Sequence, residues 1–303
     1  MSSDPQSLLT ATLTHVSAGR PAAPVLGSGV LVSGFGDTGG QVQLSRLTTG
    51  AVYATGLLPD GTASLITGGV FVVFGVRADE VTNLGEVITY GVNDMVLDNW
   101  GQVQRWTATA PLTSHGTSGI GFVNFGTVGS FEAQQPIVTY GRGARGFNQY
   151  DGTVAHARFR AITTHGDGAI GVQVSKPVGT VEILEGITTY GTVGETLVKG
   201  VVEQLPADAF SVKSGGEVQR LLVGTDLATH GANVTTYALD GGHVRELRVA
   251  RQILAAGARA TAISVREGGS TPLTHVAARA PHGQVLRNEE GQLTDQTGFT
   301  TKP

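Results

Sequence analysis

"ITTHGDGAIGVQVSKPVGTVEILEGITTYG", from Ile162 to Gly191, begins and ends with nearly the same five residues. The two copies of this phrase lie 25 residues apart, measured from Gly166 to Gly191. Between them, short apolar runs alternate with glycine turns, a pattern typical of strands rather than of an amphipathic helix. An internal repeat of this length indicates a chain built from stacked structural units.

The same phrase recurs along most of the chain. Aligned on its last glycine, it reads "LITGG", "VITYG", "LTSHG", "IVTYG", "ITTHG", "ITTYG", "LATHG" and "ILAAG", ending at Gly69, Gly91, Gly116, Gly141, Gly166, Gly191, Gly231 and Gly257. The four steps from Gly91 to Gly191 are all 25 residues long. Each unit holds three short β-prone runs, and such a unit can bury its apolar face only against its neighbours.

The repeat therefore predicts an all-β protein, a single-domain right-handed parallel β-helix (solenoid) of about ten coils with ~25 residues per coil. Equivalent residues of successive coils then form inward columns. The first predicted column is Leu65, Val87, Leu112, Ile137, Ile162, Ile187, Leu227 and Ile253. The second is Thr67, Thr89, Ser114, Thr139, Thr164, Thr189 and Thr229. The third is Leu97, Phe122, Phe147, Val172, Leu197, Tyr237 and Ile263.

The rhythm breaks at three places, which sets the predicted organisation. Residues 1–40 are expected to cap the N-terminal end, residues 41–283 to form the solenoid, and residues 284–303 to form a C-terminal cap or a loose tail. The step from Gly191 to Gly231 is 40 residues long. We assign the extra residues to a protruding loop around 205–208.

Composition excludes several classes of function. Because the chain has no cysteine, disulfides, thiolate metal sites and cysteine nucleophiles are absent. The chain has 303 residues and a formal net charge of −4. This charge offers no basic field for a nucleic-acid backbone, and we expect no nucleic-acid partner. No run approaches the ~18 apolar residues of a transmembrane helix, so no membrane partner is expected. The first 20 residues lack a basic, then apolar, signal-peptide pattern, so a cytoplasmic location is the default, with secretion or surface display still open.

The coil phrases resemble a known family. "ITTHGDGAIGV", "ITTYG" and "GIGFVNFGTV" are similar to coils of right-handed parallel β-helix proteins of the pectin-lyase-like superfamily and of autotransporter passengers, over roughly residues 40–285. The resemblance implies the fold. It leaves the activity open among lyases, hydrolases, epimerases, adhesins and tailspikes, and it favours a homo-oligomer, with a trimer the commonest form.

One column alternates between two ring types. It consists of Tyr90, His115, Tyr140, His165, Tyr190 and His230, each directly before a repeat glycine. If these side chains face outward, this Tyr/His stripe either stacks sugar rings or packs against another protomer. Histidines two coils apart lie about 10 Å from each other, too far to share a metal ion. We therefore expect no metal site, and nothing in the sequence indicates a cofactor.

Polar residues gather where each coil leaves its apolar pattern. The segments are "LDNWG", "VNFG", "FNQYDG", "VQVSKPVG" and "LVKG", with "SVKSGG" following them. On successive coils they should line one side of the rod, although Asn-Gly and Asp-Gly pairs are also ordinary turn formers. The substrate-binding residues predicted from these segments are Asp98, Asn124, Asn148, Tyr150, Gln173 and Lys199.

Two other residues of these segments, Lys176 and Asp151, are the candidate catalytic groups. A lysine can remove the proton next to a carboxylate, as a lyase or an epimerase requires. Alternatively, Asp98 and Asp151 could act as the two carboxylates of a glycoside hydrolase.

Two functions follow from these observations. The first is a protein that binds or processes a carbohydrate, a sugar acid or another small polar ligand in a groove along the solenoid. The second is a non-catalytic structural or adhesin-like rod that self-associates through the Tyr/His stripe. The polar insertions on successive coils favour the first, and the sequence does not decide whether the protein is an enzyme.

Overall fold

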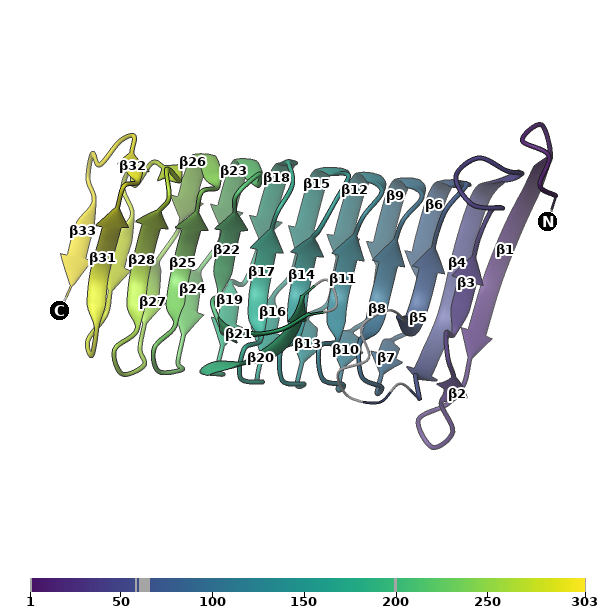
Figure 1. Ribbon diagram of the computed structural model, residues 1–303, viewed down its shortest axis with the longest axis horizontal. Helices are drawn as coiled ribbons and strands as arrows, with labels where there is room; N and C mark the ends of the chain where they lie inside the picture. Colours follow the sequence, from purple (N-terminus) through teal and green to yellow (C-terminus); the bar gives the residue numbers. More distant parts are fainter. Residues whose placement is uncertain (1, 58, 60–65, 199–200, 303) are drawn as a thin grey trace.

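The chain forms a parallel β-solenoid of about ten turns, with about 26 residues per turn. The computed structural model describes residues 2–57, 59, 66–198 and 201–302, and within these ranges it contains strands and turns but no helix. The turns stack into a rod with the N-terminus at one end and the C-terminus at the other (Figure 1). The predicted fold class is confirmed.

Each turn contributes one strand to each of three faces. The first face is a ten-stranded parallel sheet made of β3 (Val30–Val32), β5 (Thr67–Val72), β8 (Asp94–Asn99), β11 (Ile120–Asn124), β14 (Arg145–Gln149), β17 (Ile170–Val174), β22 (Phe210–Lys213), β25 (Thr235–Asp240), β28 (Thr261–Arg266) and β31 (Gln284–Glu289).

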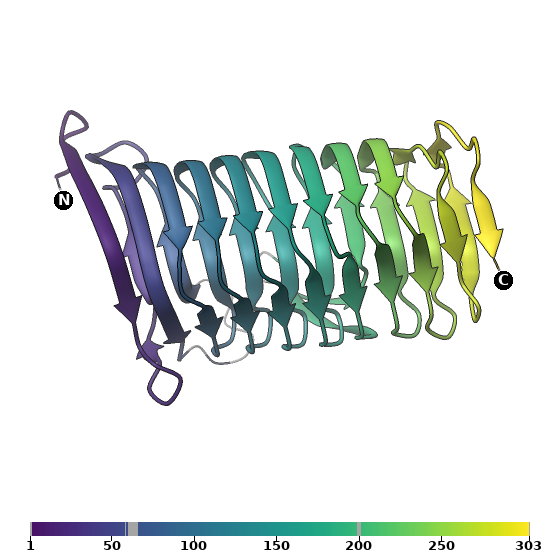
Figure 2. The ribbon, with the colours of Figure 1, turned by 180° about the vertical axis from the view of Figure 1, so that it is seen from behind.

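The other two faces belong to one 21-stranded sheet, because the long strand β4 pairs with strands of both (Figure 2). One set of strands, all six residues or longer except β29 and β32, is β1 (Leu8–Ala18), β4 (Gln41–Thr55), β6 (Val76–Asn83), β9 (Gln102–Ala108), β12 (Thr127–Ala133), β15 (Thr153–Phe159), β18 (Val178–Ile183), β23 (Glu217–Val223), β26 (His243–Val249), β29 (Ser270–Thr271) and β32 (Gln292–Leu293). The other set is β2 (Val25–Leu26), β7 (Val87–Thr89), β10 (Leu112–Ser114), β13 (Ile137–Thr139), β16 (Ile162–Thr164), β19 (Ile187–Thr189), β24 (Asp226–Thr229), β27 (Gln252–Ala255), β30 (Ala277–Arg279) and β33 (Thr300–Lys302).

The 25-residue spacing sets the strand register. Ile137 pairs with Ile162, and Ile162 pairs with Ile187, so the predicted inward column is continuous and buried from Val87 to Ile253. The first members of two predicted columns, Leu65 and Thr67, are aligned with the wrong strand. Val52, in the long strand β4, is the residue that pairs with Val87, whereas Thr67 begins a strand of the ten-stranded sheet. Leu65 lies outside the described residues.

The interior is packed with stacked apolar and aromatic side chains. Phe122 lies at the centre of this packing, with its ring 3.9 Å from that of Phe131 and 5.5 Å from that of Phe147. Trp106 is fully buried and donates its indole N–H to Asn83 Oδ1 at 2.8 Å. Pairing the one polar atom of this large side chain makes its burial favourable.

The insertion in the long step is a hairpin, not a loop at 205–208. Its antiparallel strands are β20 (Val193–Val198) and β21 (Val201–Pro206), and the coil resumes at Ala207, which is buried. Phe210 therefore takes the core position that we assigned to Leu197, and it pairs with Val172 and Tyr237. The hairpin crosses neighbouring coils in front of β14 and β11 (Figure 1).

Strands continue into both predicted terminal segments. The N-terminal segment holds β1, β2 and β3, which pair with β4 and β5, and the C-terminal segment holds β31, β32 and β33. In the described part of the chain, no helix has the length and apolar character needed to cross a membrane.

Candidate functional site

The site is built on the outer surface of the ten-stranded sheet. One outward column, here called the outer column, changes in character along the rod. Its members, in register, are Leu31, Phe71, Asp98, Val123, Asn148, Gln173, Ser211, Ala238, Ser264 and Arg287. The column is apolar near the N-terminus, polar in the middle and charged at its last member, so different parts of one surface suit different ligand chemistry.

An aromatic row runs beside the outer column. Trp100, Phe125 and Tyr150 directly follow three successive strands of this sheet. The rings of Trp100 and Phe125 stack at 4.0 Å, and those of Phe125 and Tyr150 lie 4.9 Å apart. The row is not among the features predicted from the sequence, although its 25-residue spacing is visible in the quoted segments.

The N-terminal half of this surface is hollowed into a cavity of about 490 Å³, the apolar cavity. Its lining includes Phe71, Ile120 and Val123 from the sheet, the aromatic row, and Leu197 from the hairpin. Leu31, Ile66 and Phe74 also line it and are exposed, so the cavity opens to solvent between apolar side chains. This volume falls within the ~300–1,000 Å³ range of small-molecule sites.

Two polar side chains of the outer column are buried beside this cavity. Asp98 is fully buried, and neither of its carboxylate oxygens forms a hydrogen bond with a described residue. Burial raises the pKa of Asp98 to about 8, and the nearby Trp100 side chain, which is not within hydrogen-bond geometry, offsets only part of this effect. Asn148 lines the cavity, is fully buried, and has both its amide nitrogen and its amide oxygen unpaired among the described residues.

Arg145 lies next to Asn148 in the cavity lining and is only 2% exposed. Its Nε donates to Gln173 Oε1 at 3.2 Å, and its Nη1 lies 3.4 Å from the carbonyl oxygen of Gly143. Burial lowers its pKa to about 10, so the guanidinium remains charged at neutral pH. Arg145 is not among the residues predicted from the sequence, and it occupies the position of Ile120 and Ile170 in the neighbouring strands.

A second hollow of about 530 Å³, the polar cavity, adjoins the first at Tyr150, which lines both. Gln173, Lys176 and Lys213 line it from the sheet side, together with Ser175 and Ser214, and Glu203 and Leu205 line it from the hairpin. The polar cavity brings together three residues predicted for the site, namely Tyr150, Gln173 and Lys176. It offers a ligand the ammonium groups of Lys176 and Lys213, hydroxyls and an amide, with the carboxylate of Glu203 on the hairpin side.

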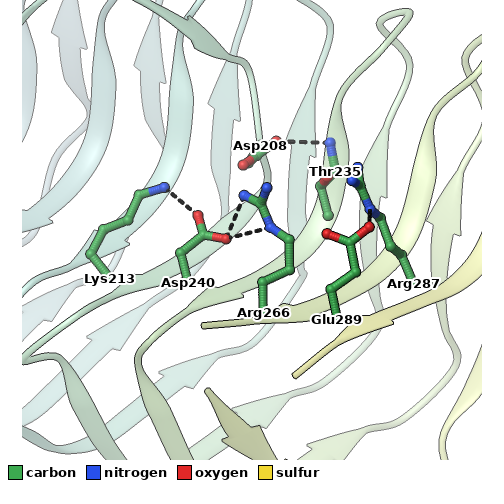
Figure 3. A network of polar contacts seen from close by, with 7 residues as sticks. All are labelled: Asp208, Lys213, Thr235, Asp240, Arg266, Arg287 and Glu289. Atoms are coloured by element: carbon green, nitrogen blue, oxygen red, sulfur yellow. Dashed lines mark hydrogen bonds and ion pairs between the residues drawn. The ribbon is translucent and has the colours of Figure 1, made fainter. Parts of the chain in front are cut away.

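Lys213 belongs to a charged network at the C-terminal side of the polar cavity (Figure 3). Its Nζ lies 2.7 Å from Asp240 Oδ2, and Arg266 donates two hydrogen bonds to Asp240 Oδ1. Burial alone would raise the pKa of Asp240, but these two cations lower it. Nearby, burial raises the pKa of Asp208 to about 7, although Asp208 accepts a hydrogen bond from the Thr235 amide.

The two predicted catalytic residues lie close together but near the surface. Lys176 Nζ is 4.0 Å from Asp151 Oδ1, and the two side chains are 50% and 64% exposed. Asp151 lies in the turn after β14 and is not part of the polar cavity lining. Asp98 lies in β8, two strands away from β14, after which the Asp151 turn follows. Two strand spacings correspond to at least about 10 Å between Asp98 and that turn. The structure therefore does not bring Asp98 and Asp151 together as a carboxylate pair.

Asn124 lies on the opposite side of the sheet from the two cavities. Its amide nitrogen donates to Gln149 Oε1 at 3.1 Å, and its amide oxygen accepts from Asn99 Nδ2 at 2.7 Å. These three buried side chains form an interior amide ladder at the corner of the coils. The last predicted ligand residue, Lys199, lies outside the described residues.

The Tyr/His stripe is a continuous stack of rings. Adjacent centroids from Tyr90 to His230 lie 5.2, 5.0, 4.9, 5.1 and 4.9 Å apart, and adjacent planes differ by at most 15°. Because each inner ring has a neighbour on both faces, only ring edges remain for a partner. The stripe therefore does not offer ring faces on which sugars could stack, except at its two ends.

The remaining large hollow carries fewer unpaired groups for a ligand. A hollow of about 1020 Å³ lies over β18, β23 and β26, but its arginines are paired on the surface, with Arg245 2.7 Å from Glu217 and Arg248 2.7 Å from Glu246. Within the described ranges, no three histidine, aspartate or glutamate side chains are grouped as metal ligands.

The fold places the chain among the parallel β-solenoid proteins. A scan of protein-family models finds none that matches it, and searches of the curated proteins and of the solved structures find no match either. The function must therefore be argued from the cavities themselves.

Proposed function

We propose that the protein binds an acidic carbohydrate in the polar cavity. One observation carries the proposal: Lys176 and Lys213 line the same 530 Å³ hollow, together with Tyr150, Gln173 and two serines. Ammonium groups attract the carboxylate of a sugar acid, and amide and hydroxyl groups exchange hydrogen bonds with sugar hydroxyls. The ring of Tyr150 supplies an apolar surface for the C–H face of a sugar.

Binding is better supported than catalysis by Lys176. A lysine becomes an effective base when burial or a second cation favours its neutral form. The ammonium of Lys176 lies 4.0 Å from the carboxylate of Asp151, and half of the lysine side chain is exposed. This geometry suits an ion pair with a ligand carboxylate. The similarity to pectin-lyase-like coils supports a carbohydrate ligand without choosing a reaction.

The test compares galacturonate with galactose by thermal shift and calorimetry. Galacturonate should raise the melting temperature, because a ligand at 100 times its dissociation constant stabilises a protein by ~2.7 kcal/mol, whereas galactose should bind much more weakly. Lys176→Met and Lys213→Met should each abolish this preference. Arg160→Met is the matched control, because Arg160 forms an exposed ion pair with Glu185 on another face. Equal binding of both sugars, or an unchanged preference in both lysine variants, would contradict the proposal.

The second candidate function is a structural rod that self-associates, and the exposed edges of the Tyr/His stripe favour it. Tyr140 and Tyr190 are each 48% exposed, which is high for large aromatic side chains. A partner protomer could cover this edge, and similar β-helices favour a trimer. In light scattering, the double variant Tyr140→Ala with His165→Ala should then have a lower mass than the unmodified protein. The same mass in both proteins would exclude the stripe as an interface.

A further inference from the structure

We propose that the apolar cavity is a second binding site, which takes an amphipathic carboxylate. The carboxylate would lie against Arg145 and Asn148, and the apolar body would pack against Trp100 and Phe125. This site shares only Tyr150 with the polar cavity, so the inference does not depend on the proposed carbohydrate function.

Arg145 is buried, and most of its donors are not used by the described residues. A guanidinium has five N–H donors, and among the described residues Arg145 uses them only for Gln173 Oε1 and Gly143 O. No ion pair within 4.0 Å joins it to a carboxylate of the described residues, although the more distant Glu203 carboxylate of the hairpin partly offsets the effect of burial on the Arg145 pKa. A buried charge without a counterion is costly, so it is expected where a ligand supplies the missing charge. The planar guanidinium fits the two oxygens of a carboxylate.

Asn148 adds an independent argument. Its amide group is fully buried, lines the same cavity and has no partner on either atom among the described residues. Buried polar groups in folded proteins are almost always hydrogen-bonded, so two such atoms facing a cavity indicate a polar group of a ligand. The Asn148 amide nitrogen can donate to the carboxylate that Arg145 binds.

The rest of the cavity defines the other end of the ligand. Phe71, Ile120 and Val123 form an apolar floor, and exposed Leu31, Ile66 and Phe74 surround the entrance. An apolar group placed here would remove these side chains from water, which is the main source of affinity in such cavities. Asp98 is buried beside this part of the cavity. Burial raises its pKa to about 8, so its carboxyl group is mostly neutral at pH 7 and does not repel an anion.

These features favour an aryl or branched aliphatic carboxylic acid over the alternatives. A neutral apolar molecule would leave Arg145 without a counterion. A cationic ligand would place a second positive charge beside it. A free uronic acid would cover little of the apolar surface with its hydroxyl-rich ring.

The experiment uses 4-phenylbutyrate and its uncharged amide, 4-phenylbutanamide, as matched probes. The chain has two tryptophans, and only Trp100 lines the cavity, so tryptophan fluorescence reports binding. The acid should bind the unmodified protein at least tenfold more tightly than the amide. Trp100→Phe, in which Trp106 remains as a buried control, should abolish the fluorescence change.

The variant Arg145→Met should bind the acid and the amide equally, while its melting temperature stays the same or rises, because it replaces an unpaired buried charge with an apolar side chain of similar length. A purely structural arginine would give a lower melting temperature instead. Asn148→Leu serves as the second variant and should weaken binding of the acid without lowering stability. Lys176→Met and Arg160→Met should leave both affinities unchanged.

Three results would overturn the inference. The first is equal affinity of the unmodified protein for the acid and the amide. The second is an unchanged preference for the acid in both Arg145→Met and Asn148→Leu. The third is the absence of binding of either probe at millimolar concentration. Galacturonate binding in the polar cavity is measured separately, so failure of one site can be distinguished from failure of the other.

Discussion

Asp98 and Asn148 lie in the same outward column of one sheet, separated only by Val123. Both are fully buried, and neither has a side-chain hydrogen bond to a described residue. Larger polar groups of the interior are paired, as in the amide ladder of Asn99, Asn124 and Gln149, whereas the buried hydroxyls of Thr89, Ser114 and Thr139 have no partner among the described residues. Asp98 and Asn148 differ from those hydroxyls because each has two unpaired polar atoms, and both residues belong to the surface that also carries the cavities, where a ligand can pair them.

The first prediction concerns the pH dependence of stability. Burial raises the pKa of Asp98 from 3.8 to about 8, so the folded protein holds a proton that the unfolded chain releases. The contribution of Asp98 to the free energy of unfolding is therefore greatest below about pH 4 and falls as the pH rises to about 8, by at most about 1.4 kcal/mol per pH unit. Asp98→Asn removes this titration. The melting temperature of the variant minus that of the unmodified protein should grow from pH 5 to pH 8.

Asp208 titrates in the same direction, because burial raises its pKa to about 7, but it is present in both proteins and cancels in the difference. A difference in melting temperature that stays constant from pH 5 to pH 8 would show that Asp98 is not held neutral by the fold.

The second prediction separates two asparagines that look alike in the sequence. Asn124→Ala leaves Asn99 Nδ2 and Gln149 Oε1 without their partners inside the rod, so it should lower the free energy of unfolding by about 2–4 kcal/mol. Asn148→Leu removes two unpaired buried atoms and should leave stability unchanged or raise it. Urea denaturation of both variants measures the contrast. Equal losses in the two variants would contradict the assignment of Asn124 to the interior and Asn148 to the site.

These asparagines also show how far the sequence predicts the site. The regular step of 25 residues is enough to predict the solenoid and its inward column, since every identical step adds a rung in register. It does not predict which side of a strand a polar residue faces. Asn124 pairs with Gln149, not with Asn148, and this shift of one residue moves the side chain from the cavity to the core.

Insertions limit the prediction in a second way. Because extra residues precede Thr67, Val52 and not a residue near Thr67 pairs with Val87. Because the hairpin is inserted, Leu197 lies in the hairpin and not in the predicted core column. Arg145 could not be recognised, because in the sequence it is one charged residue in an apolar column. Only the fold shows that it is buried with no carboxylate of the described residues at ion-pair distance.

The last prediction concerns the repeat glycine itself. At Gly141 an added Cβ would overlap the carbonyl oxygen of Gly116 on the preceding coil, and at Gly166 it would overlap that of Gly141. The obstacle is backbone on both coils, so neither side can move without breaking the stacking of strands. Gly141→Ala should therefore lower the free energy of unfolding by about 3 kcal/mol or more, in the range of severe substitutions.

Gly36→Asn is the control for this substitution. Gly36 has a φ of +64°, which asparagine tolerates, and an added Cβ there would meet no atom within 4 Å. Gly36→Asn should therefore lower the free energy of unfolding by less than about 1 kcal/mol. Urea denaturation of both variants decides the matter. If Gly141→Ala cost no more than Gly36→Asn, the coils would not approach each other at the repeat glycine, and the residue would be repeated for its turn geometry instead of for close stacking.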